Sequence, residues 1–514
     1  MAVISVDAGT TMIKAVGYDG AGIESTVVRQ ETSLQRREPG WVEQDMAEVW
    51  NAVVHTVRLV ANELHEPVEF VALTAQGDGC WLVDRQGRPT GPAILWNDGR
   101  AGAVIDGWRR AGVLEAAFRI NGSMGFAGLP HAILRWLQRY DPDRVERSAT
   151  ALTCGGWLYS QLTGRVGVDS SDGSAPFMDL ATGGYSDKLL AHFELGWARR
   201  LLPTLLDGDR RVAELTPGAA TQLGLRAGTP VVLSAYDIAS TAIGCGVVEP
   251  GQACSILGTT LCTEVVTDAP DLGGTPAGLT VRLGIPGRLL RALPTLAGGE
   301  VISWCCRLLD LDTPEELGEL AQQVEPGAGG LSFLPYLSPA GERVPFLDEH
   351  ARGSLMGLSF EHTRGHVARA ALEGLTLVIR DCLAASGTSP TQLRVCGGGA
   401  ASAVWCQLIA DVTGVPTARS EDHEVGARGA MVMGAAHAGL TEDVPSAVNR
   451  YVRLRDSFQP DPSRHQAYRL LYEDFRALRE VAEAGWPRLS VMRERAPAGQ
   501  HTVTHPSRTP RRPR

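Results

Sequence analysis

Apolar residues in the first part of the chain form short runs that are separated by tight polar turns. Residues 3–7 and 12–18 are two such runs around the turn Gly9-Thr10-Thr11, a pattern that predicts a β-hairpin. Residues 23–30 predict a third strand, and residues 46–65 carry apolar side chains at helical spacing. The chain should therefore begin with three strands followed by a helix.

Further along, apolar runs of strand length end in small or polar residues. Residues 68–74 predict a buried strand that ends in Ala75-Gln76-Gly77-Asp78-Gly79, and residues 93–96 lead into Asn97-Asp98-Gly99-Arg100. Polar residues gathered where buried strands end are what a ligand cleft in an open α/β sheet requires.

The second half of the chain repeats the opening pattern. Residues 251–260 again read as a strand that ends in a Gly-Thr-Thr turn, which suggests a duplicated fold. Residues 393–396 predict a further strand, followed by three glycines and a helix through residue 408. We therefore expect an N-terminal domain over residues 1–248 and a C-terminal domain over residues 249–485. The Arg- and Pro-rich residues 486–514 are expected to be a disordered basic tail.

Composition narrows the function classes. Net charge is −10 and the pI is about 5.7, which argues against nucleic acid as a partner. No long apolar stretch and no leader pattern is visible, so we expect a cytoplasmic protein. The ten cysteines form no CxxC motif and are expected to be buried free thiols. The zinc-protease, α/β-hydrolase and P-loop motifs are absent.

Two aspartates at strand ends are candidates for phosphate chemistry. Asp7 precedes the first Gly-Thr-Thr turn, whose backbone N–H groups and hydroxyls could bind a nucleotide tail while Asp7 holds a hydrated Mg²⁺. The alternative is an ordinary polar hairpin tip. Asp237 ends the apolar run of residues 229–235 and could be a general base or simply a helix N-cap.

Taken together, these segments resemble the FGGY family of carbohydrate kinases over nearly all of the chain. The resemblance rests on residues 7–14, 39–45, 75–79, 94–100, 236–237, 258–260 and 397–405. It implies an α/β fold with two actin-like ATPase (ribonuclease H-like) domains around a central cleft. It also implies an ATP- and Mg²⁺-dependent kinase.

The resemblance also implies roles for individual residues. Asp237 would be the catalytic base, and Asp7 would hold Mg²⁺ through water. The residues expected to border ATP are Thr10, Thr11, Lys14, Gly258, Thr259, Thr260, Gly299, Ser303, Gly398, Gly399 and Ala400. The residues expected to contact the substrate are Gln76, Gly77, Asp78, Asn97, Asp98 and Asp237. Asn97 and Asp98 could instead form a plain turn, and Trp81 and Trp96 could fill the core.

The resemblance is strongest to kinases of L-xylulose and of erythritol. It implies phosphorylation of a terminal hydroxyl of a small open-chain sugar or polyol. Xylulokinases carry Met-His, and glycerol kinases Arg-Glu, where this chain has Gly77-Asp78, so we expect Gly77 to leave room for the substrate. The alternatives are xylulokinase- or ribulokinase-type activity on another ketopentose, an actin-like ATPase that serves as an interaction protein, and a silent sugar sensor. The sequence leaves open whether the protein forms a homodimer.

Overall fold

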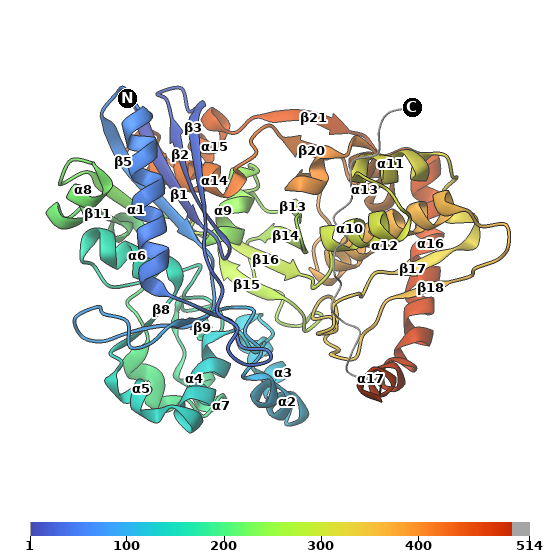
Figure 1. Cartoon of the computed structure of the whole chain (residues 1–514), viewed down its shortest axis with the longest axis horizontal. Helices are drawn as coiled ribbons and strands as arrows, with labels where there is room; N and C mark the ends of the chain where they lie inside the picture. Colours follow the sequence, from blue (N-terminus) through green and yellow to red (C-terminus); the bar gives the residue numbers. More distant parts are fainter. Residues whose placement is uncertain (1, 496–514) are drawn as a thin grey trace.

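The computed structural model describes residues 2–495, which form two β-sheets side by side (Figure 1). In the N-terminal sheet the antiparallel strands β1, β2 and β3 are extended by β5 and β12, which run parallel to β1. Its strands stand in the order β11 (Val212–Glu214), β12 (Pro230–Leu233), β5 (Val68–Ala75), β1 (Ala2–Ala8), β2 (Met12–Tyr18) and β3 (Glu24–Glu31).

The C-terminal sheet repeats this plan. Its antiparallel strands β13, β14 and β16 are extended by β19 and β20, which run parallel to β13. The order is β15 (Leu279–Arg282), β16 (Leu289–Pro294), β14 (Leu261–Thr267), β13 (Gln252–Leu257), β19 (Gln392–Cys396), β20 (Thr417–Ser420) and β21 (Leu454–Phe458). One Gly-Thr-Thr turn connects β1 to β2, and the other connects β13 to β14 at the corresponding place in the second sheet. The predicted duplication is therefore confirmed.

Two helices pack between the sheets, α9 (Asp237–Gly244) and α14 (Val425–His437) (Figure 1). They approach closely because each carries a glycine at the crossing: a Cβ on Gly244 would lie 2.0 Å from the Val425 carbonyl oxygen, and one on Gly429 would lie 1.7 Å from that of Ser240. Helix α14 also contacts β1 and β5. The segment that contains α14 therefore packs against the N-terminal sheet, although it lies far beyond residue 248 in the chain. The predicted domain boundary at residue 248 does not account for this contact, and the boundary stays a prediction.

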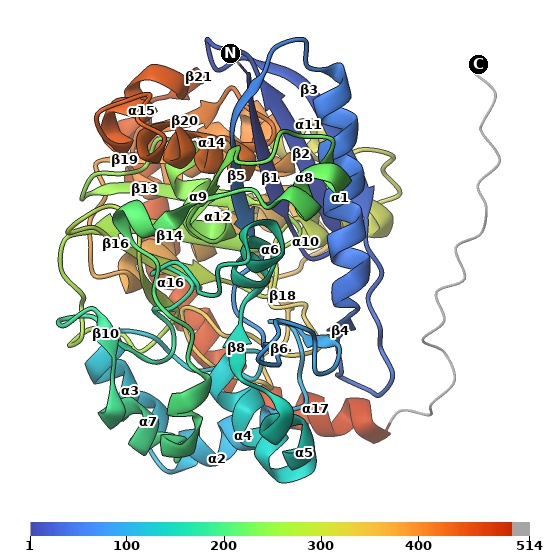
Figure 2. The same cartoon turned by 90° about the vertical axis from the view of Figure 1, so that its left-hand side faces the viewer.

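The outer face of the N-terminal sheet is covered by α1 (Met46–Glu63), with α6 (Cys154–Thr163) and α8 (Pro217–Leu223) beside it (Figure 2). Helix α1 buries an apolar stripe with helical spacing, and its N-cap Asp45 accepts hydrogen bonds from two backbone N–H groups. Below the sheet in Figure 1 lies a mainly helical region made of α2 (Gly102–Arg110), α3 (Val113–Asn121), α4 (Pro130–Tyr140), α5 (Pro142–Arg147), α7 (Asp187–His192) and the 3₁₀ turn η1 (Gly196–Leu201). A second 3₁₀ turn, η2 (Gly208–Arg211), leads into β11 and contacts α14.

Short strand pairs complete this half: β4 (Glu43–Gln44) with β7 (Ala93–Ile94), β6 (Trp81–Val83) with β8 (Thr150–Leu152), and β9 (Met178–Asp179) with β10 (Gly184–Tyr185). The other half contains β17 (Ser332–Leu334) paired with β18 (Ser354–Met356), α10 (Gly299–Leu308), α11 (Pro314–Gln322), η3 (Ala328–Gly330), α12 (Arg364–Ala385), η4 (Gly398–Ala401), α13 (Ala403–Thr413), α15 (Val444–Tyr451) and α16 (Pro462–Glu483).

The prediction of a disordered tail from residue 486 is wrong for its first part. Residues Trp486–Arg495 form helix α17, because Trp486 is fully buried and stacks on Phe346 at 5.7 Å between ring centroids. Residues 496–514 lie outside the described part of the chain.

All ten cysteines are buried free thiols, as predicted. Within residues 2–495, no helix combines the length and apolar character that crossing a membrane requires.

Candidate active site

The turn between β1 and β2 is held in place by three side chains from the same half. Thr10 Oγ1 donates to Gln76 Oε1 and accepts from Trp96 Nε1, each at 2.9 Å. Gln44 Nε2 donates to the Thr10 carbonyl oxygen at 3.0 Å, and Gln76 Nε2 donates to Gln44 Oε1. Gln76, predicted as a substrate contact, therefore supports the turn predicted to bind phosphate. Thr11, next to Thr10, is exposed.

Asp7 and Lys14 face each other across this hairpin. Lys14 Nζ lies 3.6 Å from Asp7 Oδ2 and 2.9 Å from Glu424 Oε2, and Arg29 forms a second ion pair with Glu424 at 2.6 Å. Burial raises the pKa of Asp7, and the charge of Lys14 opposes that shift. Glu424 directly precedes α14, so this cluster ties the hairpin to the C-terminal segment. No motif in the sequence pointed to Glu424.

Space for the Asp7 carboxylate is left by a glycine of the same segment. A Cβ on Gly426 would lie 3.0 Å from Asp7 Oδ2 and 3.6 Å from Thr241 Oγ1 of α9. The carboxylate is thus at the place where β1, α9 and α14 meet. Sequence reasoning placed Asp7 at a strand end but could not supply these neighbours.

Asp237 is the first residue of α9, at the end of the N-terminal sheet next to Asp7. Burial, together with the negative charges of Asp7 and Asp78, raises its pKa to about 7, although backbone hydrogen bonds from Ile238 and Gly77 lower it. The N-cap position belongs to Tyr236, and the Asp237 carboxylate accepts a hydrogen bond from the adjacent Ile238 N–H at 2.8 Å. Asp237 is therefore not an N-cap, and a carboxylate that titrates near neutrality suits a general base.

Asp78 lies close enough to influence Asp237. Its φ of 56° is a left-handed conformation that aspartate tolerates. Burial raises the pKa of Asp78 to about 7, although the charge of Arg343 lowers it. Arg343 comes from the other half of the chain, and its guanidinium lies 4.9 Å from the Phe126 ring and 5.5 Å from the Trp96 ring. No motif in the sequence pointed to Arg343, because it follows no recognisable strand end.

The expectation that Gly77 leaves room for substrate is wrong. A Cβ on Gly77 would lie 1.9 Å from Cδ2 and 2.3 Å from Cε2 of Tyr236. The space beside Gly77 is therefore filled by the Tyr236 ring rather than open. Glycine is needed here so that the ring can approach the backbone.

The remaining predicted substrate contacts differ in their surroundings. Asn97 is exposed, whereas Asp98 is 2% exposed and accepts hydrogen bonds from Val42 N–H at 2.6 Å and Arg100 N–H at 2.9 Å. The Arg100 guanidinium is paired with the same carboxylate at 2.8 Å. Asp98 thus stabilises its own loop. Trp81 is core, at 1% exposed, as favoured from the sequence.

In the C-terminal half, most of the residues predicted to border ATP surround one cavity of about 510 Å³. Backbone bonds bring its walls together, with Gly299 N–H donating to the Gly258 carbonyl oxygen at 2.8 Å. Ala400 is buried behind the wall, and Thr260 lies outside the lining. The predicted residues that line the cavity are Gly258, Thr259, Gly299, Ser303, Gly398 and Gly399, together with the unpredicted Glu300, Glu315, Ala401 and Trp405.

Comparison with known proteins agrees with this architecture. Residues 2–244 match the N-terminal domain of the FGGY family of carbohydrate kinases, and residues 253–438 match its C-terminal domain. The chain belongs to the FGGY family of carbohydrate kinases. The FGGY resemblance and the fold class drawn from the sequence are therefore confirmed, and the protein is a phosphotransferase of the carbohydrate kinase class.

Individual FGGY kinases align over almost the whole chain. The erythritol kinase of Brucella abortus is 32% identical over 512 residues, which cover 95% of this chain and 98% of that protein. The xylulose kinase of Escherichia coli is 29% identical, covering 92% of this chain and 98% of its own length. The crystal structure of xylulose kinase from Rhodospirillum rubrum is 29% identical, with a TM-score of 0.85 over 95% of this chain and 100% of that one.

Proposed function

We propose that the protein transfers the γ-phosphoryl group of ATP to a terminal hydroxyl of a small open-chain polyol or sugar. Erythritol is the first candidate, because the B. abortus erythritol kinase is the more similar of the two curated relatives named above. A pentulose such as L-xylulose is the second, in line with the xylulose kinases. The observation that carries the proposal is Asp237, a half-buried carboxylate at the start of α9, where burial and the charge of Asp7 raise its pKa to about 7.

Each half of the molecule would contribute one substrate site. ATP would occupy the cavity of about 510 Å³ in the C-terminal half, with Gly258 and Thr259 near its phosphates. The acceptor would lie at the end of the N-terminal sheet, where Asp78 and Arg343 can hold its hydroxyls. Asp237 would accept the proton of the attacking hydroxyl, since an in-line phosphoryl transfer needs a positioned base.

The residues at Asp7 fit a magnesium ion. The described residues contain no group of three or more side chains that could hold a metal by themselves. Mg²⁺ does not need such a group, because it keeps several waters, through which a carboxylate can hold it, and takes its other ligands from the nucleotide phosphates. Asp7 would hold the ion through water, and the ion would neutralise charge on the phosphates.

A screen of acceptors tests the proposal. ADP release is measured with erythritol, L-xylulose, D-xylulose, D-ribulose and glycerol at fixed ATP and Mg²⁺. We expect release that depends on a four- or five-carbon acceptor and a phosphorylated product. ATP hydrolysis that is independent of every acceptor would instead favour the interaction-protein alternative, and no nucleotide turnover at all would favour the sensor.

A further inference from the structure

Tyr236 precedes the proposed base and has an unusual environment for a core tyrosine. Its side chain is only 4% exposed, yet within residues 2–495 its buried hydroxyl has no hydrogen-bond partner. A buried tyrosine hydroxyl normally finds a partner. Burial raises the pKa of the hydroxyl, and the negative charges of Asp78, Asp237 and Asp172 raise it as well.

The ring of Tyr236 fills the space beside Gly77. The contact is so close that any side chain at Gly77 would overlap the ring, with Cβ only 1.9 Å from Cδ2. Gly77 and Asp78 are consecutive, and the Gly77 N–H is bonded to the Asp237 carboxylate. The ring thus lies between the strand end that carries Asp78 and the helix start that carries Asp237.

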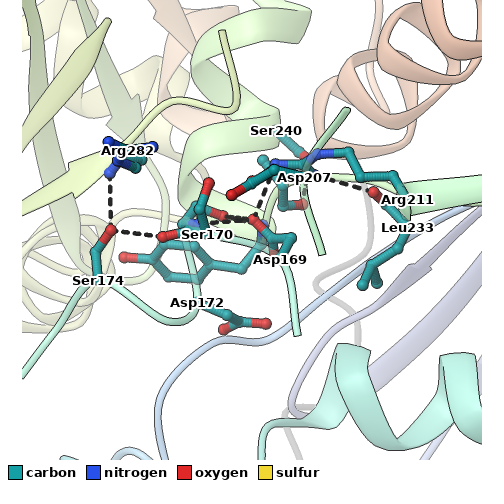
Figure 3. A network of polar contacts seen from close by, with 12 residues as sticks. Asp169, Ser170, Asp172, Ser174, Asp207, Arg211, Leu233, Ser240 and Arg282 are labelled. Carbon is teal, nitrogen blue, oxygen red and sulfur yellow. Dashed lines mark hydrogen bonds and ion pairs between the residues drawn. The ribbon is translucent and has the colours of Figure 1, made fainter. Parts of the chain in front are cut away.

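A buried polar network holds Tyr236 in this position. The Tyr236 N–H donates to Ser171 Oγ at 3.0 Å, and the Ser171 hydroxyl donates to Asp169. Arg211 lies 3.6 Å from Asp169 and donates to the carbonyl oxygen of Leu233, three residues before Tyr236, at 3.0 Å (Figure 3). Because the side chains of Asp169 and Arg211 are each 1% exposed, breaking this network would leave a buried charge unpaired. The backbone that carries the ring is therefore firmly anchored.

We propose that Tyr236 is a substrate-binding residue that sets the length of the acceptor: its ring, seated on Gly77, closes one end of the pocket, and its hydroxyl bonds a substrate hydroxyl. The pocket would then favour a linear four-carbon polyol over five-carbon sugars. This inference rests on the proposed function and names the acceptor class of the same site.

The first test separates binding from packing. In Tyr236→Phe the ring remains and only the hydroxyl is lost. We expect the Kd for erythritol, measured by calorimetry, and its KM to rise about fivefold to tenfold, the loss of one hydrogen bond. The KM for ATP and the thermal midpoint should not worsen. Tyr18→Phe is the matched control, because the Tyr18 hydroxyl is also buried without a partner but lies on β2. Unchanged erythritol binding in Tyr236→Phe would overturn the inference.

The second test concerns length. Tyr236→Ala empties the space beside Gly77, so the ratio of kcat/KM for L-xylulose to that for erythritol should rise about tenfold or more. Gly77→Ala should lower the thermal midpoint in the wild-type background but much less in Tyr236→Ala, since the overlap is then removed. An unchanged substrate ratio, or independent effects of the two substitutions, would overturn the inference.

If the wild type phosphorylates no acceptor, the proposed function fails and this inference with it. If the wild type phosphorylates an acceptor, the results for the Tyr236 and Gly77 variants decide the inference alone.

Discussion

Replacing the proposed base, Asp237→Asn, should remove turnover and stabilise the fold at the same time. The amide keeps the size of the side chain but cannot accept the proton of the acceptor hydroxyl. We expect kcat to fall by about 10² to 10⁴, as for the loss of a general base. ATP binding should stay within about twofold of wild type, because the predicted nucleotide cavity is in the other half of the molecule.

The stability gain follows from the raised pKa. The pKa of Asp237 is about 7 in the fold against 3.8 ordinarily. A raised folded-state pKa gives stability that is present below pH 3.8 and is lost as the pH rises through about 7. At 1.36 kcal/mol per pH unit, this difference sets an upper limit of about 4 kcal/mol. Asp237 is only half-buried, and solvent screening reduces this limit, so we expect about 2 kcal/mol at pH 8.

The assay is urea unfolding of both proteins at pH 5, 6, 7 and 8, paired with steady-state kinetics. The stability difference in favour of the variant should increase with pH up to about 7 and then level off. Asp84→Asn is the control, because hydrogen bonds from the Arg88 and Gln86 backbone and the Arg88 side chain lower the pKa of that exposed carboxyl. It should leave kcat unchanged and lower stability at pH 8. A variant with kcat within threefold of wild type, or a stability difference independent of pH, would refute the reasoning.

Two further predictions concern the same site, and a third concerns the crossing of α9 and α14. With both substrates below KM, the specificity constant should be about tenfold lower at pH 6 than at pH 8, because the base with a pKa of about 7 must be ionised; a flat profile contradicts this. Asp78→Ala should raise the acceptor KM by about tenfold to 150-fold, the loss of a hydrogen bond to a charged group, and an equal rise in the ATP KM would point to a structural role. Gly429→Ala places a Cβ 1.7 Å from the Ser240 carbonyl oxygen, so thermal unfolding should show a strong loss of stability, whereas Gly107→Ala, which meets nothing within 4 Å, should cost none.

The sequence by itself determined the strands, their ends and the duplication, because these depend on local patterns. Apolar runs predicted β1, β2, β5 and β12, and the aspartates at or just after the ends of β1, β5 and β12 marked Asp7, Asp78 and Asp237 as site candidates. The Gly-Thr-Thr turn appeared in both halves for the same local reason.

Tertiary structure decided which residues complete the site, because their contacts join segments that are far apart in the chain. Glu424 reaches Lys14 only since α14 returns to the N-terminal sheet, and Arg343 crosses from the other half to Asp78. The expectation for Gly77 was wrong for the same reason. In the sequence a glycine suggests open space for a substrate, but in the fold the Tyr236 ring occupies that space. Helix α17 likewise formed where composition predicted disorder, because Trp486 is fully buried and stacks on the Phe346 ring.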